Sequence, residues 1–283
     1  MRKTQTIVTI LVGVVCVLVA VRLVVYAATE NQYRASLPEE IVSIQLDEST
    51  VYLIPARDGY LLFDTGYPWD YDTFRAAIEG YGIPLSSIRY AFISHAHDDH
   101  VGFLGTLAAA NPNMKVIVHE RSVPHLATGK NNKDNGGGLF NRFVYLAFRV
   151  KKRLKPHWTL TFPPFTVREI DIVWSGDAGE MPDAVGMNAT LLFTPGHTSD
   201  SVSLLYEGTH LFCGDLASTS FNLLGGQQLT VFNEDVEALY ESWSNVLSRD
   251  IPVTVPSHGH PFRTEKLHRY IGRLTQDQLV SFF

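Results

Sequence analysis

Short apolar runs dominate the chain from about residue 40 onward, and turn-forming residues separate them. Runs rich in β-branched and aromatic residues predict strands over 41–46, 51–54, 60–64, 90–94, 116–119, 190–193, 201–206, 210–213 and 253–256. Apolar positions at three- and four-residue spacing predict helices over 69–81, 101–110, 234–248 and from 262 onward. Asn233 is the expected cap of the third helix. The interleaving predicts a layered α/β fold with mixed sheets rather than a simple parallel βαβ array.

The N-terminal segment follows a different pattern, because residues 7–28 are almost wholly apolar. About 20 apolar residues span a bilayer, and Arg2 and Lys3 before the stretch favour a cytoplasmic start. We therefore expect residues 1–28 to be a membrane anchor, a transmembrane helix that leaves the remainder of the chain outside the cytoplasm. The alternative is a signal peptide cleaved near Ala27 or Ala28, which would give a secreted protein.

Residues 29–283 are expected to form one domain, with a basic helical insertion at about 121–157. The insertion holds nine Lys and Arg residues and one acid, Asp134, although the whole chain has a net charge of −6. Within it, 139–155 has the spacing of an amphipathic helix. This helix could contact an anionic membrane surface, cover an active site as a lid, or pack on the domain with a solvated basic face.

Composition narrows the function classes. The acidic net charge argues against a general nucleic-acid binder. The two cysteines, Cys16 and Cys213, exclude a disulfide framework and a cysteine-based zinc cluster.

A dense group of potential metal ligands follows the predicted strand 90–94. Residues 95–100 read His-Ala-His-Asp-Asp-His, and imidazole with carboxylate suits zinc or iron. Three later segments also place a histidine or an aspartate directly after a strand: 194–198, 212–215 and 256–261. Each of these is weak evidence alone, but strand-end loops can converge on one site.

Five motifs in order carry a family resemblance. They are Phe-Asp-Thr-Gly at 63–66, the cluster at 95–100, Pro-Gly-His-Thr at 195–198, Gly-Asp at 214–215 and Ser-His-Gly at 257–259. Over about residues 40–265 the chain resembles the metallo-β-lactamase superfamily of hydrolases. The resemblance implies a four-layer αββα sandwich of two mixed β-sheets, with metals at one edge.

Carried over to this sequence, the resemblance implies two metal sites. The first would use His95, His97 and His197, the second would use Asp99, His100 and His258, and Asp215 would bridge both. Asp98 stands at a variable position and is expected to be a supporting or solvated residue. Asp64 is expected to orient a ligand histidine. His260 is the less favoured alternative to His258.

The implied activity is hydrolysis by a metal-bridging hydroxide, with Asp99 and Asp215 as catalytic residues and Asp99 as proton carrier. The expected partner is a small-molecule substrate, an ester, thioester or lactone that could carry an acyl or lipid-like group. Phosphodiester hydrolysis, a mono-iron enzyme like persulfide dioxygenase, and a non-catalytic metal-binding relative are the alternatives. Two zinc ions are the expected cofactors, with iron or manganese possible because they accept the same ligands.

Overall fold

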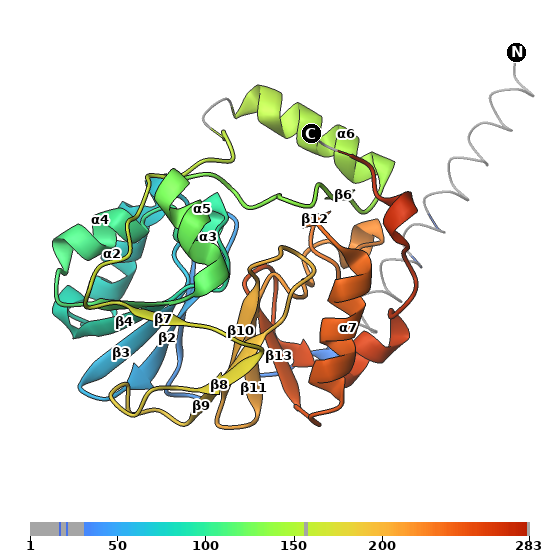
Figure 1. Cartoon of the computed structure of the whole chain (residues 1–283). Coiled ribbons are helices and arrows are strands. Elements are labelled where there is room, and N and C mark those ends of the chain that lie inside the picture. Colours follow the sequence, from blue (N-terminus) through green and yellow to red (C-terminus); the bar gives the residue numbers. More distant parts are fainter. Residues whose placement is uncertain (1–16, 18–20, 22–30, 156–157, 282–283) are drawn as a thin grey trace, which may run out of the picture.

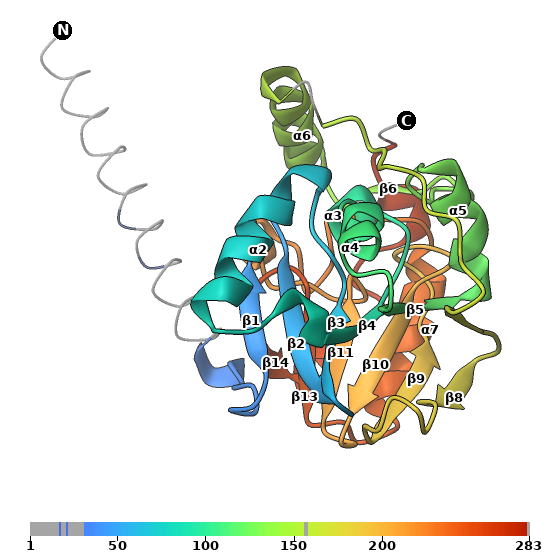
Figure 2. The same ribbon diagram turned by 90° about the vertical axis from the view of Figure 1, so that its left-hand side faces the viewer.

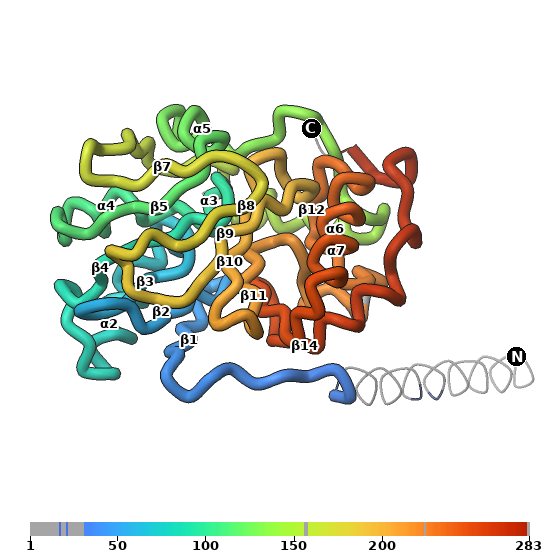
Figure 3. The backbone as a smooth tube through the Cα atoms, turned by 60° about the horizontal axis from the view of Figure 1, so that its bottom comes forward, coloured from blue at the N-terminus to red at the C-terminus, as the bar shows by residue number. Residues whose placement is uncertain are grey.

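The computed structural model describes residues 31–155 and 158–281, together with residues 17 and 21. The described strands form two six-stranded sheets that pack face to face, and helices cover the two outer faces (Figure 1). The predicted four-layer sandwich of two mixed sheets is confirmed. Figure 3 shows the blue-to-green half of the chain beside the orange-to-red half.

The first sheet has the strand order β1-β2-β3-β4-β5-β7. Its strands are β1 (Val42–Gln45), β2 (Thr50–Ala56), β3 (Gly59–Phe63), β4 (Ile88–Phe92), β5 (Lys115–His119) and β7 (Ile172–Trp174). β1, β2 and β3 pair antiparallel, whereas β3, β4, β5 and β7 run parallel. Parallel strands end at the same edge of a sheet, so the loops after β3 and β4 emerge side by side.

The second sheet has the strand order β14-β13-β11-β10-β9-β8. Its strands are β8 (Ala178–Glu180), β9 (Ala189–Phe193), β10 (Val202–Tyr206), β11 (His210–Gly214), β13 (Val253–Pro256) and β14 (Phe262–Arg263). β11 and β13 are parallel, and Gly214 is paired with Pro256 at their ends. The loops that follow these two strands therefore also emerge together. A separate two-stranded ribbon joins β6 (Gly138–Leu139) to β12 (Phe232–Asn233).

The helices separate into two layers and one outlier. They are α2 (Tyr71–Gly80), α3 (Asp98–Val101), α4 (Leu104–Ala110), α5 (Val123–Thr128), α6 (Arg142–Leu154) and α7 (Val236–Leu247). Figure 2 shows α2 and α4 on the outer face of the first sheet, and Figure 1 shows α7 on the second. Between the sheets, Tyr52 meets Phe212 edge to face, with ring centroids 5.2 Å apart. Helix α6 lies at the upper edge of the sandwich in Figure 1.

Two local predictions are wrong. The helix expected over 234–248 is present as α7, but its cap is Asp235 and not Asn233, because the Asp235 carboxylate accepts from the Ala238 amide at 3.0 Å. The segment from Phe262 is not an α-helix, because Phe262 is fully buried and pairs with Thr254 as strand β14. Short 3₁₀ turns at Thr264–Arg269 and Gln276–Gln278 follow it. Pairing at the sheet edge has overridden the helical spacing there.

The expected membrane-anchored location is corrected. Among the residues that the structure describes, no helix is both long and apolar enough to cross a bilayer. The predicted anchor at 1–28 lies outside the described residues, except for Val17 and Val21.

Candidate metal centre

The candidate ligands lie on loops at one edge of the sandwich. His95 and His97 follow β4, and Asp99 and His100 lie in the single-turn helix α3 that comes next. The second sheet contributes the other three residues, which follow β9, β11 and β13: His197, Asp215 and His258. All seven residues predicted to bind metal are thus brought together. Their roles as ligands stay a prediction.

The side chains form two groups that overlap. The ligand atoms of His95, His97 and His197 lie within 4.8 Å of one another, and so do those of Asp99, His100 and His258. These are the two sets that the resemblance implied. A third combination, which also fits this distance, joins His95 and His100 to Asp215.

Asp215 lies between the two groups. Its Oδ2 is 3.4 Å from His197 Nε2 in the first group. Its Oδ1 is 3.3 Å from His258 Nε2 and 3.4 Å from His100 Nε2 in the second. One carboxylate oxygen therefore faces each group, which is the arrangement that a bridging ligand needs.

Three polar atoms at the centre are buried and make no hydrogen bond: His95 Nε2, His100 Nε2 and Asp215 Oδ1. Leaving a buried polar atom unpaired costs about 1–3 kcal/mol, so such atoms are rare without a partner. Imidazole nitrogen and carboxylate oxygen are also the donors that zinc, iron and manganese accept. The donor set therefore fits a pair of divalent cations.

The other nitrogen of several ring side chains is held by the protein. His97 Nε2 lies 2.8 Å from the Asn132 carbonyl, and His258 Nδ1 lies 2.8 Å from the Glu48 carbonyl. His197 Nδ1 lies 2.8 Å from the Phe232 carbonyl. A carbonyl can only accept, so each of these nitrogens donates, and in the neutral ring the opposite nitrogen is the one that can bind metal.

Asp64 supports the centre from beneath, as expected. Its Oδ2 is 2.9 Å from His100 Nδ1, and its two oxygens accept from the backbone amide and the hydroxyl of Ser94, each at 2.7 Å. Ser94 Oγ is in turn 3.0 Å from His95 Nδ1. Asp64 has a φ of 58°, in the left-handed region that few non-glycine residues adopt. This turn after β3 directs the carboxylate back under both groups.

A second buried carboxylate, Asp200, was not found from the sequence. Its Oδ2 accepts from the Ala96 amide at 3.0 Å, and its Oδ1 accepts from Asn132 Nδ2 at 2.6 Å. It thus holds the loop between His95 and His97 as well as the residue that orients His97. The only sequence signal was its position just after the Pro-Gly-His-Thr motif, which does not identify its partners.

Close packing by α7 positions His197. Gly196 has a φ of 136°, and a Cβ there would come within 2.3 Å of the Leu239 Cα. A larger residue would push α7 away from the loop. Glycine is therefore needed directly before this histidine.

The two groups differ in proton affinity. Burial lowers the pKa of His95 and of His97, and it lowers the pKa of His197 to about 4. Burial acts the same way on His258, but the charges of Asp215 and Asp99 outweigh it and raise the pKa to about 9. The first group is therefore neutral near pH 7, whereas the second holds protons that offset its carboxylates.

Two neighbouring residues behave differently from the ligands. Asp98 is buried, so the expectation that it might be solvated is wrong. Its Oδ1 accepts from Asn131 Nδ2 at 2.7 Å, and burial beside Asp99 raises its pKa to about 7. The alternative ligand His260 belongs to none of the described ligand groups, and its Nδ1 lies 3.1 Å from Thr219 Oγ1.

A cavity of about 540 Å³ opens above the centre. One side of it, which we call the floor, carries five of the candidate ligands: His97, Asp99, His197, Asp215 and His258. The opposite side, which we call the roof, is helix α6, with Val144, Ala147, Phe148 and Lys151 facing the cavity. The basic insertion therefore covers the site.

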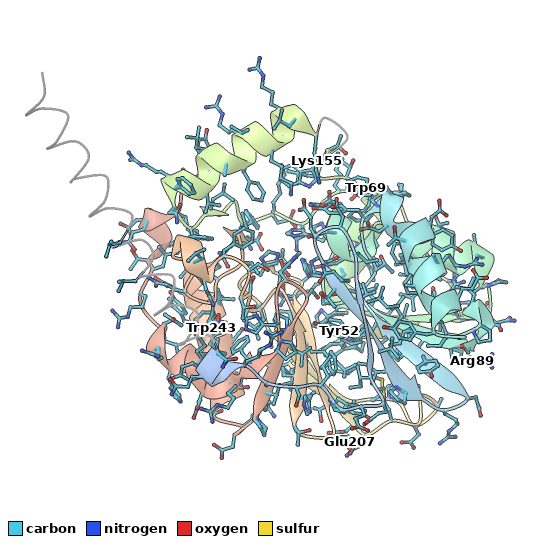
Figure 4. All side chains as sticks on the ribbon, turned by 180° about the vertical axis from the view of Figure 1, so that it is seen from behind. Tyr52, Trp69, Arg89, Lys155, Glu207 and Trp243 are labelled. Carbon is cyan, nitrogen blue, oxygen red and sulfur yellow. The ribbon has the colours of Figure 1, made fainter. Side chains whose placement is uncertain are left out.

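Ion pairs attach the roof to the loop between β1 and β2. Lys151 pairs with Glu48, and Lys155 Nζ lies 3.1 Å from Asp47 Oδ2. Figure 4 shows Lys155 at the end of α6, above the first sheet. The Glu48 carbonyl also accepts from His258, so one residue contacts both roof and floor.

Residues 44–258 match the sequence model of the metallo-beta-lactamase superfamily. The chain belongs to this superfamily. The match covers both ligand groups and the insertion between them. The family resemblance inferred from the five motifs is confirmed.

Curated relatives are distant. Metallo-beta-lactamase domain-containing protein 1 of Xenopus laevis is 25% identical over 77% of this chain and 72% of its own length. The rat protein of the same name is 27% identical over 72% of this chain, which spans only 63% of the rat protein. Hydroxyacylglutathione hydrolase of Francisella philomiragia is 24% identical, with 79% of this chain and 70% of that protein covered.

Solved structures share the superfamily fold. A Cronobacter sakazakii metallo-beta-lactamase has a TM-score of 0.57 at 20% identity and covers 85% of this chain and 90% of that one. An archaeal superfamily protein from Sulfolobus tokodaii also has a TM-score of 0.57, at 19% identity, over 84% of this chain and 86% of that one.

Proposed function

We propose that the protein is a hydrolase that uses two divalent metal ions, with zinc as the first choice. The observation that carries this proposal is the pair of ligand groups that share Asp215 and open into one cavity. The buried atoms of His95, His100 and Asp215 that make no hydrogen bond support it, because the ion-pair contacts of His100 Nε2 and Asp215 Oδ1 are with other candidate ligands. His95, His97 and His197 would hold one ion, and Asp99, His100 and His258 the other.

When bound, the ions polarise the substrate carbonyl and lower the pKa of the attacking water. In the reaction, a C–O bond forms between the water oxygen and the acyl carbon, while the C–O or C–S bond to the leaving group breaks. Asp99 borders the cavity, and its Oδ2 is 3.2 Å from His258 Nε2. It would accept the proton of the water and deliver it to the leaving alkoxide or thiolate. Asp215, whose two oxygens face the two ligand groups, would fix the position of one site relative to the other.

Two observations favour an acyl substrate, which means an ester, a thioester or a lactone. One relative is named as a hydroxyacylglutathione hydrolase. Among the described residues, no arginine lines the cavity, although arginine is the side chain best suited to bind phosphate in two-point fashion. A phosphodiester substrate therefore has less support.

The test is a substrate panel combined with metal analysis. Purified protein is loaded with zinc, iron or manganese and assayed on p-nitrophenyl esters, acyl thioesters and lactones, and on bis-p-nitrophenyl phosphate. We expect two ions per chain and turnover of one of the acyl classes. Turnover of the phosphodiester alone would replace the acyl assignment. Retention of no metal would refute the hydrolase proposal in favour of a binding role.

A further inference from the structure

The cavity above the metal centre has walls of two kinds. Its floor carries imidazole and carboxylate groups. Its roof and sides are largely apolar, with Leu139, Val144, Phe148, Trp158, Phe221 and Phe232 among the lining residues. These come from four separate segments of the chain, so the apolar character belongs to the cavity as a whole.

The apolar wall reaches the metal centre itself. The ring centroid of Phe232 lies 5.9 Å from that of His197 and 6.0 Å from that of His97. At the roof, Phe148 and Trp158 meet edge to face, with centroids 5.0 Å apart. Apolar side chains therefore line the cavity both beside the metal centre and at α6, so a substrate that reacts at the floor would contact them along its length.

The positive charge that the roof presents to the cavity, that of Lys151, already has partners within the protein. Lys151 pairs with Glu48, and its ammonium group lies 4.2 Å from the centroid of the Trp158 ring. The indole nitrogen of Trp158 donates to Tyr67 Oη at 3.1 Å. The polar atoms of this wall thus bind one another, and they leave the ring faces and aliphatic groups for a substrate.

We propose that the cavity beneath α6 is an acyl-chain site, and that the preferred substrate carries an extended run of methylene groups. This inference rests on the proposed function for the position of the reacting carbonyl, which lies at the floor. The chain extends toward the roof beneath α6. Ala147 is a small residue of α6 that lines the cavity, so a larger side chain there would take space from the chain.

Chain length is the direct measure of such a site. Burying one methylene group contributes about 0.8 kcal/mol, which is close to fourfold in a binding constant. With incomplete burial we expect kcat/KM to rise on the order of 100-fold from p-nitrophenyl acetate to p-nitrophenyl octanoate. The rise should stop once the cavity is filled.

Two tryptophan variants at neighbouring positions of α6, one that lines the cavity and one that does not, test the location. In Ala147→Trp the indole takes up space in the cavity beneath α6, and the octanoate-to-acetate ratio of kcat/KM should fall at least tenfold. Leu146→Trp is the matched control, because Leu146 is 60% exposed and does not line the cavity. Its ratio should equal that of the wild type. Phe148→Ala provides a second variant, which should shift the preference toward longer chains.

Binding to metal-free protein separates this inference from the proposed function. In isothermal titration calorimetry, decanoate should bind the metal-free protein and acetate should not. The Ala147→Trp substitution should lower the affinity for decanoate. Hydrolysis with no dependence on chain length would overturn the acyl-chain site and leave the hydrolase proposal standing. If no ester, thioester or lactone reacts, the acyl assignment of the proposed function fails, and decanoate binding alone then supports or overturns the site.

Discussion

The floor and the roof face each other across one cavity, yet different interactions hold them in place. The floor side chains are mostly buried and have partners on both sides of the sandwich, such as Asp64 under His100 and Asp200 behind the loop before His97. The roof is a single helix whose outer face exposes large apolar residues, and paired lysines fasten it.

This difference indicates how function is divided. A group that must hold ions at fixed spacing requires rigid support, because small displacements of ligands weaken coordination. A wall that only contacts a substrate chain can be fastened by half-exposed ion pairs, which contribute little stability. Changes to the floor should therefore abolish activity, whereas changes to the roof should adjust it.

The largest effect is expected at the shared ligand. Asp215→Ala removes the carboxylate that faces both ligand groups, so both sites lose an anchor and kcat/KM should fall by more than about a thousandfold. The fold should persist, because four layers of packed elements do not depend on this residue.

Metal content, kcat/KM and the circular dichroism spectrum together check this prediction. Asp277→Ala is a suitable control, because Asp277 is an exposed carboxylate on the turn Gln276–Gln278 and belongs to neither ligand group. Turnover close to the wild-type value in Asp215→Ala would contradict the two-metal mechanism.

Variants of the two supporting carboxylates, Asp64 and Asp200, should affect the metal affinities of the two ligand groups unequally. Asp64→Asn weakens the hold on His100 and should lower the affinity of the second group for metal by about 10–100-fold, with the first group less affected. Asp200→Asn acts on the loop of His95 and His97 and should do the reverse. Competition with a chelator, read for each site by cobalt absorption, measures both. An equal loss at both sites in each variant would show that the groups do not respond independently.

The groups should also differ in their dependence on pH. In the metal-free protein His258 has a pKa raised to about 9 and is protonated at pH 7, so metal must displace its proton. The charges of Asp99, Asp215 and Asp64 also outweigh burial and raise the pKa of His100, so affinity at the second group should rise at least about tenfold per pH unit up to pH 9. His197, with a pKa near 4, is already neutral, so the first group should change little between pH 6 and 8.

Calorimetry in two buffers with different enthalpies of ionisation counts the protons released by each ion. At pH 7 the ion that enters the first group should release close to none, and the ion that enters the second group should release at least one. Equal release by the two ions would mean that this difference between the groups is wrong.

Much of the floor could be predicted because its ligands are concentrated in sequence. Four of them fall within residues 95–100, and the others each follow a recognisable strand. The supporting contacts were harder to find, since Asn132 and Asp200 are 68 residues apart and neither has a distinctive neighbourhood. The roof helix was visible from its spacing, but its attachment was not, because Lys151 and Glu48 are separated by 103 residues.

The smallest effect is expected at the roof attachment. Lys151→Met keeps the length of the side chain and removes the ion pair with Glu48, in which the two side chains are 22% and 28% exposed. Such pairs contribute about 0.2–1 kcal/mol, so the free energy of unfolding should fall by no more than that. KM for a long-chain ester should rise severalfold while kcat changes less than twofold, because the roof loosens and the floor keeps its ligands. Arg153→Met, on the exposed side of α6, should leave both constants unchanged. A fall in kcat with KM unchanged would instead place the effect of Lys151 at the floor, through the Glu48 carbonyl that orients His258.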